Sequence, residues 1–298
     1  MEKHILSKST FLKGCQCTKA LYLSKHNRAL REEPDAAVQA IFTQGKKVGE
    51  LAQQLFPGGV DCTPVSVFDF QEAVVRTREE IAKGTKVIYE AAFQFDGVLA
   101  ALDILVKDKS GWKGYEVKSS TSVTETYELD ATIQYFAITN SGIALKDISI
   151  VHINNQYEKN GAIDVHELFT ITSVKDRVLE LLPGIPSKVA ELKAVLYAKK
   201  IPDVDIGPHC SSPYACDFVG HCWQHIPDYS VFNIARLTDT KKFDLYKKNI
   251  INFIDIPEDY PLNENQWMQV NSELNTTTTI DKKKIKEFVN DLKYPLYF

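Results

Sequence analysis

The sequence lacks any long uninterrupted hydrophobic stretch. Near the N-terminus the apolar residues are separated by Lys8, Lys13 and Lys19. No segment there has the length of a membrane span or the apolar centre of a secretion signal. We therefore expect a cytoplasmic protein without a membrane partner.

The chain also lacks an excess of positive charge. It carries 35 Lys and Arg against 39 Asp and Glu, which gives a net charge of -4 and a pI near 6.0. A nucleic acid would have to be held by a local groove, because bulk charge would not attract it. With 298 residues, 44% of them hydrophobic, the chain is long enough for one large domain or two modest ones.

Cysteine is scarce, with six residues in the whole chain. Without a secretion signal these cysteines indicate metal ligands or free thiols rather than a disulfide framework. Cys62 stands apart from the others in sequence, and we expect it to be an ordinary small residue of the core.

The hydrophobic pattern changes its period near residue 86. Helical spacing precedes this point, alternation typical of strands follows it, and a helix and a strand come next. The predicted elements are helices over 5–26, 36–56 and 70–83, strands over 87–95, 98–106 and 112–118, a helix over 125–140 and a strand over 148–154. This order predicts an α/β fold with a central mixed sheet flanked by helices.

Beyond the sheet the pattern is helical. Two helices are expected over 173–200, broken at Pro183-Gly184 and Pro186, and two more over 240–253 and 281–292. The composition becomes polar after Trp223, so we place a domain at 1–225 and a helical connector at 226–298. The aromatic run at 294–298 indicates either a native chain that continues into a further domain or a docked terminal strand.

Three charged residues interrupt the two apolar strands around residue 110. Asp103 lies in the first strand, and Glu116 and Lys118 lie on one face of the second. Isolated charges are not buried without a partner or a metal. From the residues alone, an ion pair across a hairpin and a metal site both remain open. Metal-dependent phosphodiester cleavage needs hard oxygen ligands and a positioned water.

The order of these residues resembles the PD-(D/E)XK nuclease superfamily, in particular its RecB-type group. The resemblance rests on Asp103, on Glu116-Val117-Lys118 and on Gln134 in the following helix. It implies a restriction-endonuclease-like core over residues 1–225. Asp103, Glu116 and the Val117 carbonyl would bind Mg²⁺ or Mn²⁺, Lys118 would position the water, and Gln134 would orient the lysine or the scissile phosphate.

The sequence departs from the RecB-type pattern at the early helix. The position where those nucleases carry a metal-binding histidine is occupied here by Gly49. Glu90 or Glu50 would then be the additional acidic ligand, and Glu90 is preferred because it lies in an apolar strand beside the hairpin. Loss of activity is the other consequence that this departure allows.

Three cysteines follow the predicted core with five residues in each interval: Cys210, Cys216 and Cys222. Three thiols need a fourth ligand to complete a tetrahedral zinc site or an iron–sulfur cluster. The candidates for that ligand are Cys15, Cys17, His209, His221 and His225.

The cysteine positions resemble those of iron–sulfur RecB-type nucleases, such as the CRISPR-adaptation nucleases and the AddB-type nuclease domains. That resemblance implies a 4Fe-4S cluster held by Cys17 and the three distal cysteines, with zinc as the alternative. The whole resemblance implies an exonuclease or end-processing deoxyribonuclease that acts on single-stranded DNA or free ends. The alternative is an inactive nucleic-acid-binding or scaffolding module of the same fold.

Overall fold

A hairpin of two long strands, β4 (Val98–Asp108) and β5 (Gly111–Lys118), forms the centre of the fold. Its turn is fixed by the Asp108 carboxylate, which accepts the backbone N–H of Ser110 at 2.7 Å. Gly111 closes the turn with a φ of +131°, a backbone conformation that favours glycine. The computed structural model describes residues 5–64, 66 and 70–295.

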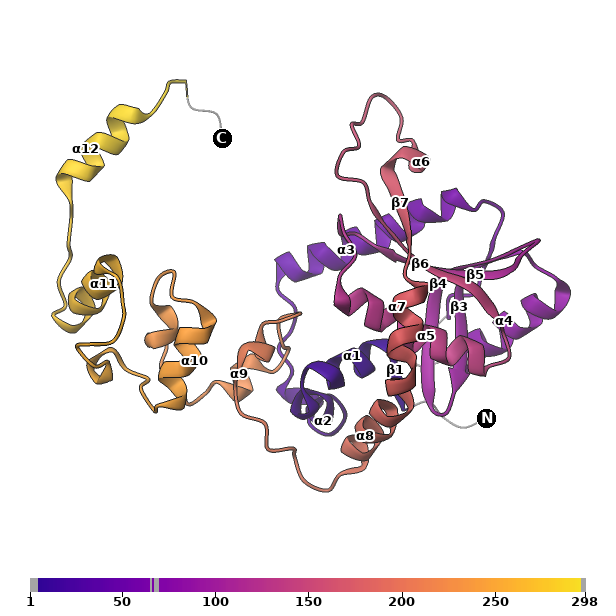
Figure 1. Cartoon of the computed structure of the whole chain (residues 1–298), viewed down its shortest axis with the longest axis horizontal. Helices are drawn as coiled ribbons and strands as arrows, with labels where there is room; N and C mark the ends of the chain where they lie inside the picture. The colour runs from indigo at the N-terminus through magenta and orange to yellow at the C-terminus, as the bar shows by residue number, and fades with distance from the viewer. Residues whose placement is uncertain (1–4, 65, 67–69, 296–298) are drawn as a thin grey trace. The chain divides into compact units, whose positions relative to one another are not determined.

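The hairpin belongs to a mixed sheet of seven strands with the order β2-β3-β4-β5-β6-β7, in which β1 also pairs with β4 (Figure 1). Pairing is antiparallel for β3–β4, β4–β5 and β6–β7 and parallel for β1–β4, β2–β3 and β5–β6. The other strands are β1 (Leu6–Ser7), β2 (Val60–Asp61), β3 (Val87–Phe95), β6 (Leu145–Ile153) and β7 (Phe169–Ser173). The expected mixed sheet flanked by helices is confirmed.

Helices cover both faces of this sheet. On one face lie α1 (Lys8–Gln16), α2 (Thr18–His26), α5 (Glu125–Asn140), α7 (Lys175–Leu181) and α8 (Ile185–Tyr197). On the other lies α3 (Ala36–Ala52), whose Ala52 packs with Tyr89, Ile104 and Tyr115. A further helix, α4 (Phe70–Lys83), packs against Ala92 and Leu99.

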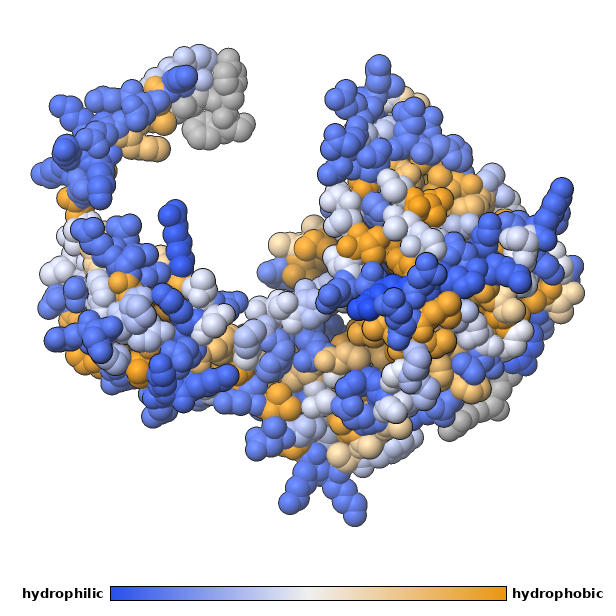
Figure 2. Space-filling model, viewed as in Figure 1, coloured by the Kyte–Doolittle hydropathy of each residue, from blue (hydrophilic) through white to orange (hydrophobic). Residues whose placement is uncertain are grey.

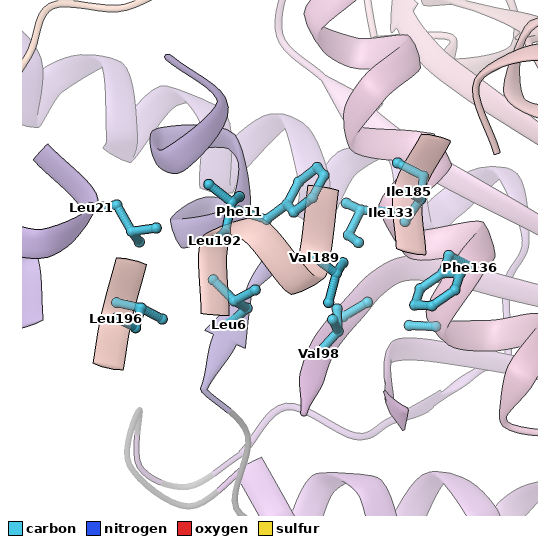
Figure 3. Packing of buried hydrophobic residues seen from close by; sticks show 12 residues of the cluster. Leu6, Phe11, Leu21, Val98, Ile133, Phe136, Ile185, Val189, Leu192 and Leu196 are labelled. Atoms are coloured by element: carbon cyan, nitrogen blue, oxygen red, sulfur yellow. The ribbon is translucent and has the colours of Figure 1, made fainter. Parts of the chain in front are cut away.

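The largest helix-to-sheet core joins β1 and α1 to α8, as Figure 3 shows. Leu6 and Phe11 are fully buried there beside Val189 and Leu192. Each such side chain contributes about 1.5–3 kcal/mol through burial. Gly14 permits this packing, because a Cβ atom at that position would lie 2.8 Å from side-chain atoms of Leu21 and Leu192. The start of α1 is therefore fixed to the sheet.

The chain folds into two compact units. The first holds the sheet and extends to Asp205, with His209–His221 added. The second contains Ile206–Pro208 and the chain from Cys222 onward, and its own core includes Val231, Leu245 and Val270. Its longer helices are α10 (Asp239–Lys247), α11 (Glu264–Leu274) and α12 (Lys282–Asp291). Figure 2 shows hydrophilic and hydrophobic residues side by side along α12.

Several local expectations were wrong. The helix expected over 5–26 is two helices, because Cys17 adopts an extended backbone conformation with φ -157° and ψ 115°. Pro186 does not break α8 but lies in its first turn, where a missing N–H costs nothing. The helix expected over 240–253 ends at Lys247. Neither α11 nor β7 was expected.

The terminal run proposed as a continuing chain extends beyond the described residues, which end at position 295. The domain boundary at residue 225 stays a prediction. Among the helices of the described chain, none is long and apolar enough to cross a membrane.

Candidate active site

Asp103 and Glu116 lie beside each other where the β4–β5 ladder ends. The last paired residues of that ladder are Ile104 and Tyr115. Beyond this pair, the Asp103 carboxylate accepts the backbone N–H of Val117 at 2.6 Å. The Asp103 side chain thus takes the place of a main-chain acceptor for the Val117 N–H. The carboxylates of Asp103 and Glu116, on neighbouring strands, face the same region.

A backbone irregularity brings a third carboxylate to the same place. Glu90 has a φ of +51°, which is unusual for a residue with a side chain. It lies in β3 opposite Asp103, between the pairs Tyr89–Ile104 and Ala91–Leu102. Backbone strain of this kind gathers at functional sites. Glu50, the other acid considered, is exposed and lies 4.0 Å from Lys46. The preference for Glu90 as an additional ligand stays a prediction.

Glu116 is the most deeply buried carboxylate of the group, with 2% of its surface exposed. One oxygen, Oε1, accepts hydrogen bonds from Lys8 at 2.7 Å and from Lys118 at 2.8 Å. The other oxygen, Oε2, is buried and has no hydrogen-bond partner among the residues that the structure describes. Such an unsatisfied charged oxygen costs free energy unless a cation or donor reaches it.

Lys118 is tied to helix α5 as well as to Glu116. Its ammonium group lies 2.5 Å from Asp130 Oδ2 and 5.2 Å from the centre of the Tyr127 ring. Gln134 Nε2 donates to Asp130 Oδ1 at 3.2 Å. Gln134 therefore contacts the partner of the lysine rather than the lysine itself. Its expected role, to orient the lysine or the scissile phosphate, stays a prediction.

The crowding of carboxylates alters their ionisation. Burial, together with the neighbouring Glu116 charge, raises the pKa of Asp103 to about 8. Burial also raises the pKa of Glu90. Burial would raise the pKa of Glu116, but the attraction of Lys118 and Lys8 outweighs it, and that pKa is lowered. Glu116 is therefore charged at neutral pH, while Asp103 and Glu90 hold protons more readily.

Lys8 and Asp130 take part in the site although the sequence pattern did not single them out. Asp130 precedes Gln134 by one helical turn, so a search for acids one turn from the glutamine would have found it. Lys8 follows the Ser7 N-cap of α1. The pairing of Leu6 and Ser7 with Val98 and Leu99 brings it to the sheet. No sequence signal would have found this contact.

Whether a divalent cation fits this site depends on the side-chain oxygen atoms that could ligate it. Within the described residues, no three His, Cys, Asp or Glu side chains converge closely enough to ligate one ion. The unpartnered Glu116 Oε2 and the adjacent Asp103 and Glu90 carboxylates are nevertheless hard oxygen donors that Mg²⁺ and Mn²⁺ prefer. These residues fit such an ion in the chemistry of their donor atoms.

The cysteines expected to bind a cluster are distributed over both units. Cys17, Cys210 and Cys216 belong to the first unit and Cys222 to the second. The Cys216 thiol lies within electrostatic range of Cys17 and Cys210, while burial is the main cause that raises its pKa to about 11. Cys15 instead packs against the core around α8. The iron–sulfur cluster stays a prediction.

A cavity of about 730 Å³ lies along α1 and α2, and Tyr214 in its wall lies within electrostatic range of Lys118 and Asp130. Its wall includes Lys13, Arg28 and Arg31, together with the aromatic rings of Phe42 and Tyr214. Lys13 and Arg31 both pair with Asp217, at 2.6 and 2.7 Å. Cationic and aromatic side chains together suit a single nucleic-acid strand.

Comparison with known proteins gives a faint likeness in structure and none in sequence. No family model matches the chain, and no curated protein matches it either. Among solved structures, the protein SSO0001 matches with 12% identity and a TM-score of 0.34, over 80% of this chain and 90% of that one. A phage-related exonuclease from Haemophilus somnus 129PT matches with 12% identity and a TM-score of 0.24, over 64% of this chain and 96% of that one.

Proposed function

We propose that this protein is a metal-dependent nuclease that hydrolyses phosphodiester bonds in DNA, as an exonuclease or end-processing enzyme. The observation that carries the proposal is the buried Glu116 carboxylate, with one oxygen on two lysines and the other oxygen unpartnered beside Asp103. A carboxylate so placed is costly in a purely structural ion pair.

The residues divide into ligands and positioning groups. Asp103, Glu116, the Val117 carbonyl and Glu90 would hold Mg²⁺ or Mn²⁺. The ion would polarise a phosphoryl oxygen and lower the pKa of water. Lys118 would hold the attacking water or the developing negative charge on phosphate. Asp130 and Gln134 keep the lysine in place through the Asp130 carboxylate.

A second function, a non-catalytic nucleic-acid-binding module of the same fold, is favoured by one observation. Lys8 and Lys118 already neutralise part of Glu116, as in a structural ion cluster. In that case the cavity beside α1 would bind a strand through its Lys13, Arg28 and Arg31 side chains without cleaving it.

Cleavage of end-labelled single-stranded DNA in Mn²⁺ separates the two functions. We expect the wild type to release short products and Asp103→Asn, which removes one ligand charge at nearly constant shape, to lose at least about a hundredfold in rate. Lys113→Ala is the matched control, because Lys113 lies on the same strand as Glu116 but pairs with Asp108 at the exposed turn. A wild type no faster than Asp103→Asn would exclude the nuclease. Circular DNA as substrate distinguishes an end-dependent enzyme.

The same protein is proposed to carry a 4Fe-4S cluster on Cys17, Cys210, Cys216 and Cys222. The proximity of the first three thiols supports it. Protein purified without oxygen should be brown with broad visible absorption, and Cys17→Ser should lose this colour while Cys62→Ser, altered in the core, keeps it. A colourless protein that contains one zinc per chain would show that these cysteines form a zinc site instead of an iron–sulfur cluster. A colourless protein that contains no metal would refute both sites.

A further inference from the structure

Lys8 is the charged residue of the site that the proposed nuclease chemistry leaves without a role. It reaches the site because β1 pairs with β4, which places the first turn of α1 over the sheet. Its Nζ atom lies 2.7 Å from Glu116 Oε1. Among the described residues, Glu116 is its hydrogen-bond partner, whereas Lys118 has both Glu116 and Asp130.

The two lysines differ in how firmly they are held. The Lys118 side chain is 18% exposed and is bound by two carboxylates, while that of Lys8 is 27% exposed and has one. The residues that follow Lys8, Ser9 and Thr10, line the open cavity beside α1. Lys8 can therefore leave Glu116 by breaking one ion pair, whereas Lys118 must break two.

A divalent cation is the group whose chemistry fits the place of Lys8. The Glu116 carboxylate, whose Oε2 atom has no hydrogen-bond partner among the described residues, faces the carboxyl groups of Asp103 and Glu90. Such oxygen atoms are the ligands that a hard divalent ion prefers. Lys8, however, occupies the same Glu116 carboxylate and repels any cation that approaches it.

We propose that Lys8 is a built-in counter-cation that competes with the divalent metal for Glu116, an inference that rests on the metal site of the proposed function. In the metal-free protein Lys8 stabilises the buried carboxylate. When the metal binds, the ammonium group moves off Glu116. Lys8 thereby sets how much metal the protein needs.

The test is a titration of the full chain with Mn²⁺, followed by the electron paramagnetic resonance signal of the free ion. We expect Lys8→Met to bind Mn²⁺ about tenfold or more tightly than the wild type, because a competing positive charge has been removed. Lys8→Arg keeps the charge and should bind no more tightly than the wild type. Lys13→Met is the control on the same helix, since its partner Asp217 keeps Arg31.

In Lys8→Met the buried Glu116 carboxylate loses one hydrogen-bond partner, which would destabilise the fold. A second measurement therefore follows the stability of this variant. Thermal unfolding followed by circular dichroism should show Mn²⁺ raising the Tm of Lys8→Met more than that of the wild type. Equal or weaker Mn²⁺ binding by Lys8→Met, or tighter binding by Lys8→Arg, would overturn the role of Lys8 and leave the nuclease proposal standing. Absence of Mn²⁺ binding in all variants would overturn the metal site itself.

Discussion

Asp130 is the residue through which helix α5 acts on the site. One of its oxygens binds Lys118 and the other accepts the Gln134 amide. Lys118 consequently has two anionic partners, and charge-assisted bonds of this kind are short and restrict a flexible side chain. The two carboxylates therefore hold the Lys118 ammonium group in a fixed position as well as balancing its charge.

Asp130→Asn should therefore impair cleavage without impairing metal binding. We expect kcat to fall about tenfold to a hundredfold, the range typical of residues that orient a functional group. Mn²⁺ affinity should change little, because Asp130 contacts the lysine and not the proposed ligands. Glu128→Gln, on the same helix but paired with Arg177, is the control. A variant that loses Mn²⁺ affinity as strongly as Asp103→Asn would make Asp130 a ligand.

The sequence alone predicts which residues come together when they lie on adjacent strands of one hairpin. Asp103, Glu116 and Lys118 could be placed near one another because a short turn fixes the register of β4 and β5. Lys8 could not, because its contact with Glu116 spans 108 residues and depends on a two-residue strand. Long-range pairing of this kind leaves no periodic trace in the chain.

At the scale of elements, the backbone irregularity at Glu90 bends β3 locally and shapes the site. We call this point the kink in β3. Ile88 and Ala91 pack into one cluster, although strict alternation would place them on opposite faces. The left-handed conformation of Glu90 accounts for the shift. The strand keeps its apolar residues buried on both sides of the kink and turns one carboxylate toward Asp103.

Replacing Glu90 by glycine separates stability from function. Glycine adopts a positive φ without strain, so Glu90→Gly should raise the free energy of unfolding by about 1 kcal/mol in urea without divalent ions. The same change should weaken Mn²⁺ binding, because it removes a proposed ligand. Asn249→Gly, at a φ of +59° in the second unit, is the control that leaves Mn²⁺ binding unchanged. Lower stability together with unaltered Mn²⁺ binding would contradict both roles of Glu90.

Element order was the most predictable feature of the fold. The helices over 70–83 and 125–140 have the expected bounds, because apolar spacing and end signals agree there. The short strand β7 and helix α11 were missed. β7 exposes three of its five side chains, so its hydrophobic pattern is weak, and its place is set by pairing with β6.

At the scale of the whole molecule, the net charge is negative, whereas one cavity carries several positively charged side chains. The net charge is -4, and the candidate site is itself acidic. The cavity along α1 and α2, however, has Lys13, Arg28 and Arg31 in its wall. Binding of a DNA strand would thus depend on this local basic surface, and it should weaken steeply as salt concentration rises.

The central claim is that Asp103 and Glu116 share a divalent cation, and diffraction from crystals soaked in Mn²⁺ tests it most directly. We expect an anomalous peak about 2.0–2.6 Å from carboxylate oxygens of both residues, with the Lys8 ammonium group moved away from Glu116. Saturating Mn²⁺ that leaves no peak at these carboxylates, with Lys8 still bound to Glu116, would contradict it.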